Sequence, residues 1–193
     1  MNDLDVRSRI IAAGRQLFSE YGYHGLSMRR IAEVVGVSKA ALYYHFQDKE
    51  SLFLAVLSSY LEALEAEIER IVQEEKSTAG RLRRLVLTIF SQPYEERAGM
   101  RVASQDMAHL SPKARETFNR LYEEKFIRRV QAILEHGMAA GELRQMDPQV
   151  VTWALLGMLY PYFYPEFPLI LPPGPELALQ LVEIFLEGTA KGK

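Results

Sequence analysis

The chain has 193 residues, a formal net charge of −2 and 48% hydrophobic residues. This length allows one or two small domains with apolar cores, and the slightly negative charge argues against a general nucleic-acid coat, which would be strongly basic. The absence of cysteine excludes disulfides, thiol catalysis and cysteine-based zinc sites. Residues 1–13 do not have the apolar length of a signal peptide, so we expect a cytoplasmic protein.

An apolar stripe at helical spacing predicts a first helix that ends near residue 21. Its members are Val6, Ile10, Ala13, Gly14, Leu17, Phe18 and Tyr21. Gly22 is expected to end this helix, and Gly14 is expected to allow a close crossing with the elements packed on it.

Residues 26–49 are expected to form two short helices joined by a tight turn. Ser27 and Ser38 are placed to cap the two helices, and Gly36 can end the first one in the left-handed conformation. Two apolar pairs have the spacing of hydrophobic staples around these caps: Leu26 with Ile31, and Val37 with Leu42. Capped helices on both sides of a glycine turn predict a helix-turn-helix.

The second of these helices, residues 39–46, suits a reader of the major groove, because recognition helices place their N-terminal residues against base edges. Hydroxyl, imidazole and cationic groups on this stretch can reach bases or phosphates, and small residues permit close approach. The candidate DNA-binding residues are Ser27, Arg29, Arg30, Ser38, Lys39, Ala40, Ala41, Tyr43, Tyr44, His45 and Lys49. Residues 24–49 carry four basic and two acidic side chains, so one copy would bind weakly and a dimer would double the footprint.

The alternative for this stretch is a helical hairpin in an ordinary bundle, with Tyr43 and Tyr44 as core aromatics. Paired caps and staples around a glycine turn are more specific than apolar periodicity alone, and they favour the helix-turn-helix.

Residues 9–52 resemble the tetracycline-repressor (TetR) family of bacterial transcription regulators. The resemblance rests on AAGRQLF in the first helix and on YGYHGLSMRRIAEVVGVSKAALYYHFQDKESL after it, about the first quarter of the chain. It implies that positions 39–41 determine most of the operator specificity and that Tyr43, Tyr44 and Lys49 mostly contact phosphates. Arg29 and His45 would also face the operator. The resemblance further implies a helical C-terminal domain that dimerises and binds an inducer.

The rest of the chain predicts further helices. Residues 48–74 contain no glycine or proline and are expected to form one long helix, with Asp48 as its cap. A polar break at residues 75–80 precedes helices expected at 82–90, which Pro93 would end, at 95–110, and from Ser111-Pro112 toward Gly141. Helices at 148–160 and 175–188 complete an all-α fold of about nine helices. We expect a homeodomain-like three-helix domain at 1–50 and an effector-binding and dimerisation domain at 51–193.

The last two expected helices are apolar on more than one face. In residues 175–188, one stripe contains Leu177, Leu181, Ile184 and Phe185, and another contains Leu179, Val182 and Leu186. One chain's core would leave one stripe exposed, so a homodimer formed through these two helices is expected, as a four-helix bundle with two-fold symmetry. Residues 150–171 carry one charge, but Pro161, Pro165 and Pro168 interrupt them, which argues against a membrane span.

Aromatic and methionine side chains in the C-terminal part are candidates for an effector pocket, although plain core packing is the alternative interpretation. The candidates are Phe90, Met100, Met107, Tyr122, Phe126 and Trp153, with Arg101, Gln105 and His109 as polar anchors. Such a lining predicts a small apolar or aromatic effector.

The sequence contains no recognisable catalytic set and implies no cofactor. Asp106 and His109 have a ligand-like spacing, and His136 is a possible neighbour, but two ligands do not make a metal site. We therefore expect an effector-released repressor that binds a palindromic operator as a dimer. The alternative is a helical small-molecule carrier or enzyme whose N-terminal helix-turn-helix no longer binds DNA.

Overall fold

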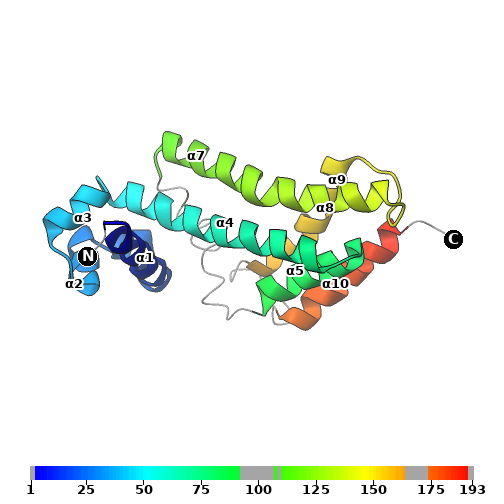
Figure 1. Ribbon diagram of the computed structural model, residues 1–193, viewed down its shortest axis with the longest axis horizontal. Helices are drawn as coiled ribbons and strands as arrows, with labels where there is room; N and C mark the ends of the chain where they lie inside the picture. The colour runs from blue at the N-terminus through cyan, green and yellow to red at the C-terminus, as the bar shows by residue number, and fades with distance from the viewer. Residues whose placement is uncertain (1–2, 92–106, 108–109, 164–173, 191–193) are drawn as a thin grey trace. The chain divides into compact units, whose positions relative to one another are not determined.

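The computed structural model describes residues 3–91, 107, 110–163 and 174–190. These residues form helices joined by short turns (Figure 1), and one isolated antiparallel bridge pairs Leu143 with Ala190. The all-α prediction is confirmed. The helix expected at 95–110 and the proline expected to precede it lie almost entirely outside the described residues.

The chain divides into two compact units, one of residues 1–62 with 98–121 and one of residues 63–97 with 122–193. The first unit contains α1 (Asp3–Gly25), α2 (Met28–Val35), α3 (Lys39–His45), the first half of α4 (Lys49–Glu74) and nearly all of α7 (Pro112–Tyr122). The division falls later than the expected boundary after residue 50, because the first half of α4 packs into the first unit.

The core of the first unit forms where α1 crosses the beginning of α4. The Phe18 ring meets the Phe53 ring edge-on at 4.8 Å between centroids, and both side chains are fully buried. A Cβ added to Gly14 would lie 2.8 Å from Cγ2 of Val56, so the close crossing expected at this glycine is confirmed. The beginning of α4 therefore belongs to the scaffold that supports the helix-turn-helix.

Gly22 interrupts α1 with a φ of 67°, as expected for the residue that ends the first helix. Tyr21, the last member of the apolar stripe, is not buried with the others, since its ring is exposed. The break at Gly22 turns Tyr23 toward the core instead, where it packs on the Phe53 ring at 5.0 Å. The Tyr21 hydroxyl lies beside Glu20, and the hydrogen bond to this carboxylate and its negative charge raise the pKa of Tyr21.

The second unit is helical and begins with the second half of α4. It contains α5 (Thr78–Phe90), the π-helical segment η2 (Glu123–Ile127), α8 (Arg128–Ala139), α9 (Pro148–Leu159), the 3-10 segment η3 (Tyr160–Phe163) and α10 (Pro175–Thr189). Helix α10 packs along α5 (Figure 1), and α8 contacts both α5 and α9. Buried apolar residues shared by these helices form its core, among them Ile71, Leu82, Val86, Val130, Leu134, Leu155 and Val182.

Two boundaries in this unit differ from expectation. Helix α5 begins at Thr78, because the Ser77 hydroxyl accepts a hydrogen bond from the Gly80 N–H at 3.0 Å and caps the helix earlier than expected. The helix expected from Pro112 onward contains a π turn, in which the Arg128 N–H donates to the Glu123 carbonyl. Neither feature has a periodic signal in the sequence.

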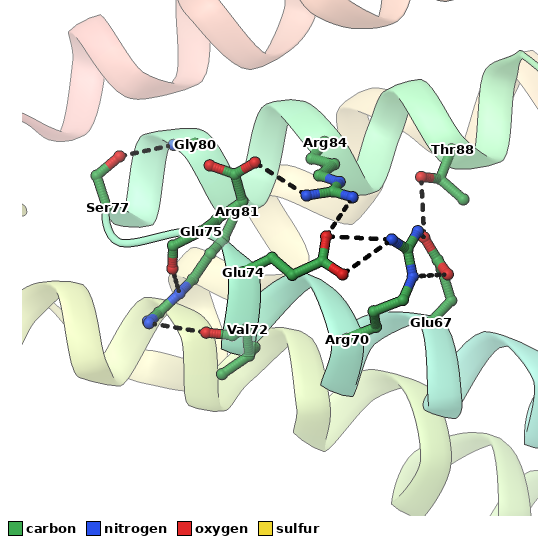
Figure 2. Close-up of polar contacts among 10 residues, drawn as sticks. All are labelled: Glu67, Arg70, Val72, Glu74, Glu75, Ser77, Gly80, Arg81, Arg84 and Thr88. Carbon is green, nitrogen blue, oxygen red and sulfur yellow. Dashed lines mark hydrogen bonds and ion pairs between the residues drawn. The ribbon is translucent and has the colours of Figure 1, made fainter.

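Figure 2 shows how polar contacts join the end of α4 to α5. Glu74 accepts a hydrogen bond from Arg70 on its own helix at 3.1 Å and pairs with Arg84 of α5 at 2.5 Å. Arg84 also reaches the Glu75 carboxylate at 3.2 Å, and Arg81 donates to the Glu75 carbonyl. The turn between the two helices is therefore held by side chains from both of them.

A second ion-pair group joins α4 to the π segment and α8. The Glu65 carboxylate accepts from Lys125 at 2.6 Å and from Arg129 at 2.7 Å. The hydrogen bonds and positive charges of these two partners lower the pKa of Glu65. The second half of α4 is thus bound on two sides within its unit.

Candidate DNA-binding surface and effector domain

The helix-turn-helix has the caps that the sequence predicts. The Ser27 hydroxyl accepts from the Arg30 N–H at 3.2 Å, and the Ser38 hydroxyl accepts from the Ala41 N–H at 3.1 Å. Gly36 adopts the left-handed conformation, with a φ of 72°, and its N–H donates to the Ala32 carbonyl at 3.0 Å. These local bonds end α2 and start α3 within a few residues, which creates the tight turn.

Helix α3 turns one apolar residue inward and presents its polar side chains to solvent. Leu42 is fully buried, whereas Tyr43 is 41% and Tyr44 is 76% exposed. Lys39 and Ala40 are exposed at the start of the helix. This arrangement rules out the alternative in which both tyrosines are core aromatics, and it leaves a helix face available to a partner.

The two arginines of α2 lie beside a glutamate on the same helix. Arg29 donates to Glu33 at 2.9 Å, and Arg30 lies 4.0 Å from the same carboxylate. Both guanidinium groups are largely exposed, so these pairs are weak and can exchange for other anions. The Lys39 ammonium lies 5.7 Å from the centre of the Tyr43 ring.

Lys49 is oriented differently from an exposed phosphate contact. Its ammonium donates to the carbonyls of Tyr23 at 2.7 Å and Leu26 at 3.0 Å and lies 4.3 Å from the centre of the Tyr23 ring. These bonds use two of the three ammonium N–H groups to hold the link between α1 and α2. Lys49 therefore has a structural role that the sequence did not reveal, and its phosphate contact stays a prediction.

The structure also brings two basic residues of α1 to the helix-turn-helix. The Arg7 guanidinium lies 5.3 Å from the centre of the Phe46 ring, next to the end of α3. Arg9 donates to the carbonyl of Val35, the last residue of α2, at 2.9 Å. No local sequence pattern indicates that Arg7 and Arg9 lie next to the helix-turn-helix, but in the structure they add positive charge beside it.

The second unit contains a small apolar cavity of about 20 Å³ between α5, η2, α8 and α9. Among the candidate pocket residues that the structure describes, only Phe126 lines it, together with aliphatic side chains and Tyr160. The Tyr122 and Tyr160 hydroxyls share a hydrogen bond within the same unit. The cavity is too small for an effector in this state.

The other candidate pocket residues are scattered. Phe90 is buried, Met107 is half-buried, and Trp153 is 45% exposed. Met100, Arg101, Gln105 and His109 lie outside the described residues. The lining expected from these four residues therefore stays a prediction, and Trp153 is not among the residues that line the cavity.

Helices α9 and α10 each carry apolar side chains on an outer face. Val150 and Trp153 of α9 are exposed, and Ile184 of α10 is 60% exposed. Leu181 is partly exposed, whereas Phe185, which the spacing places in the same stripe, is only 5% exposed and belongs to the core. The stripe divides because Phe185 projects toward the buried side with Val182, while its neighbour Ile184 projects away.

In the part of the chain that the structure describes, no three histidine, aspartate or glutamate side chains are grouped to hold a metal ion. His136 is exposed, and Asp106 and His109 lie outside the described ranges. Within the same described ranges, no helix is both long and apolar enough to cross a membrane.

Comparison with known proteins gives matches to both parts of the chain. Residues 10–56 match the family model "Bacterial regulatory proteins, tetR family", and residues 75–161 match "Tetracyclin repressor-like, C-terminal domain". The chain is 30% identical over 150 residues to the nucleoid occlusion factor SlmA of Vibrio atlanticus, which covers 77% of this chain and 76% of SlmA.

Two further similarities cover different lengths. The chain is 48% identical over 50 residues to the HTH-type transcriptional repressor AcnR of Corynebacterium diphtheriae, a quarter of each protein (26%). The solved structure of the TetR family transcriptional regulator PfmR from Thermus thermophilus is 28% identical, with a TM-score of 0.70 over 93% of this chain and 97% of PfmR.

Proposed function

The chain belongs to the TetR family of bacterial transcription regulators, and we propose that it is a cytoplasmic, effector-released repressor that binds a palindromic operator as a dimer. The exposed polar face of α3 carries this proposal. Tyr43 and Tyr44 are exposed to solvent, and Leu42 is buried beneath them. A recognition helix requires this arrangement, because one face must pack on its domain while the other contacts DNA.

The dimer is supported by the apolar outer faces of α9 and α10. Trp153 and Ile184 expose large apolar surfaces that a monomer would leave in water, and a second copy of the same helices would bury them. A two-fold dimer presents two recognition helices with the same symmetry as a palindromic operator. Two successive major grooves can be read only if these helices lie about 34–36 Å apart.

The effector is proposed to be a small apolar molecule that enlarges the cavity beside Phe126. The lining residues are apolar apart from the Tyr160 hydroxyl, so a charged group would lose its hydration there without gaining a partner. An effector releases DNA only if it binds more tightly to the state in which the separation of the two recognition helices does not match successive major grooves. Helix α4 is common to both units and is the proposed lever.

The DNA-binding part is tested with the duplex upstream of the chain's own gene. We expect specific binding whose affinity falls steeply with salt, because phosphate neutralisation releases counterions. Binding no tighter than to random DNA would favour the carrier hypothesis. Native mass spectrometry of the purified protein then reports the dimer mass and any retained small molecule together.

The release mechanism is tested with whichever molecule native mass spectrometry identifies. Calorimetric titration with and without the operator duplex should show weaker effector binding when DNA is present, since coupling between two sites is reciprocal. Equal affinities in the two titrations would mean that the pocket does not control DNA binding.

A second candidate function comes from the similarity to SlmA, which is named as a nucleoid occlusion factor and matches over most of the chain. In this case the protein would act at the nucleoid without controlling transcription of an adjacent gene. Mapping its sites on the chromosome together with transcript levels in a deletion strain separates the two. Deletion of a repressor raises the levels of the transcripts next to its sites, whereas deletion of an occlusion factor leaves these levels unchanged.

A further inference from the structure

The N-terminus of α7 has an incomplete capping box. Ser111 is the cap residue, and its hydroxyl accepts from the Ala114 N–H at 3.2 Å. In a complete box, a glutamate or glutamine three residues after the cap would bind the cap's own N–H. Ala114 occupies that position here and has no group that can accept the bond.

Glu50, in the first turn of α4, supplies the missing carboxylate from another helix. The Ser111 N–H donates to Oε1 of Glu50 at 2.6 Å, and the Ser111 hydroxyl donates to Oε2 at 2.8 Å. Both are charge-assisted hydrogen bonds, and the negative charge lies at the positive end of the α7 dipole. The box is therefore completed by a residue 61 positions earlier in the chain.

The residue before Glu50 also makes contacts outside α4. Lys49 donates to the carbonyls of Tyr23 and Leu26, and Leu26 directly precedes Ser27, the cap of α2. A cation at the start of a helix is electrostatically unfavourable, so Lys49 depends on these two carbonyls. The first turn of α4 thus binds the link that precedes α2 through Lys49 and binds α7 through Glu50.

Helix α7 continues without interruption into η2, the segment that carries Phe126 into the cavity. We infer that the Glu50–Ser111 contact is a regulatory clamp through which α7 holds the helix-turn-helix in its DNA-binding arrangement. Displacement of Phe126 by a ligand would shift α7, break the clamp and lower operator affinity. This inference rests on the proposed function, and it adds a path that does not run along α4.

The clamp is tested with Glu50→Gln, Ser111→Ala and the double variant, using the duplex that the wild-type protein selects from a random-sequence pool. We expect each single variant to bind this duplex about 5- to 30-fold more weakly, with an unchanged salt slope because no phosphate contact is lost. The double variant should bind no more weakly than the weaker single variant. The matched control is Glu62→Gln, which removes the same charge from an exposed position of α4.

A second measurement separates a clamp from a merely structural cap. Amide hydrogen exchange in the first turns of α7, residues 114–118, should slow when the wild-type protein binds the duplex, because coupling is reciprocal. The Glu50→Gln and Ser111→Ala variants should lose this DNA-dependent slowing even where they remain folded.

The outcomes distinguish this inference from the function on which it rests. If the wild-type protein selects no duplex, the proposed function fails. If the wild type binds but the variants bind within twofold of it, or the two losses are additive, the clamp is overturned and DNA binding stands. Wild-type exchange in α7 that is unaffected by DNA would also overturn the clamp.

Discussion

Thr78, the first residue of α5, packs its side chain directly against Gly137 of α8. A Cβ built on Gly137 would lie 2.5 Å from the Thr78 hydroxyl oxygen and 3.0 Å from its Cβ. Thr78 is fully buried, and its N–H donates to Glu142 at 2.7 Å, so it has little room to move away. The contact sets how closely the two helices approach.

Gly137→Ala is therefore expected to destabilise the protein by about 1–3 kcal/mol, the usual range for an overpacked contact. The free energy of unfolding from urea titration measures this loss. Gly188→Ala is the matched control, because it is also a helical glycine but its added Cβ meets no atom within 4 Å. Equal stabilities for the two variants would contradict the close contact.

The Glu65 ion pairs predict a dependence of stability on pH. The pKa of this carboxyl in the folded protein is lower than the ordinary value of 4.5, so the stabilisation is complete above about pH 4.5. It is lost as the pH falls through the lowered folded-state pKa, because the unfolded chain binds the proton first. We expect Glu65→Gln to lose stability at neutral pH and to show a flatter decline in acid.

Urea titrations from about pH 6 down to about pH 3 would measure this decline. Part of the pH dependence should remain in Glu65→Gln, because Arg84 and Arg83 also lower the pKa values of Glu74 and Glu183. Glu116→Gln, at an exposed position of α7, should follow the wild-type curve. A parallel curve for Glu65→Gln would show that its ion pairs do not contribute.

Two adjacent residues of α10 should respond differently to a negative charge. Ile184→Glu changes an exposed side chain of the proposed dimer face and should give folded monomers, whereas Phe185→Glu buries a charge in the core and should unfold the protein. Sedimentation velocity and circular dichroism distinguish the two results. Gln180→Glu, which is exposed on the same helix, is expected to remain a dimer.

Base reading and phosphate binding should separate on α3. Tyr43→Phe removes one hydroxyl and should weaken binding by a similar factor on all sequences, whereas Lys39→Ala should also change which operator is preferred. Competition between specific and random duplexes measures the ratio of the two affinities for each variant. If Lys39→Ala lowers both affinities equally, Lys39 does not read bases.

Lys49 should affect stability as well as DNA binding. Lys49→Ala leaves the carbonyls of Tyr23 and Leu26 without their donor, which is expected to cost about 1–3 kcal/mol. Thermal and urea unfolding measure this loss, with Lys76→Ala as a control for an exposed positive charge. Unchanged stability with weaker DNA binding would instead assign Lys49 to a phosphate.

Features that depend on neighbouring residues could be predicted from the amino-acid sequence. Hydroxyl caps at Ser27 and Ser38 and a left-handed glycine at Gly36 act over three or four residues, so the helix-turn-helix follows from local residue types alone. The TetR resemblance rests on the same local signals. The bounds of α4, α9 and α10 followed for a similar reason, since proline, glycine and caps end helices locally.

Tertiary packing sets which side of each helix is buried and which charged groups find partners. Ile184 and Phe185 are equally apolar in sequence, and only the packing of α10 on α5 turns one outward and the other inward. Glu50 and Ser111 are 61 residues apart, and no periodicity connects them. Such contacts depend on where two helices meet, because a side chain's partners are set by the neighbouring element as much as by its own.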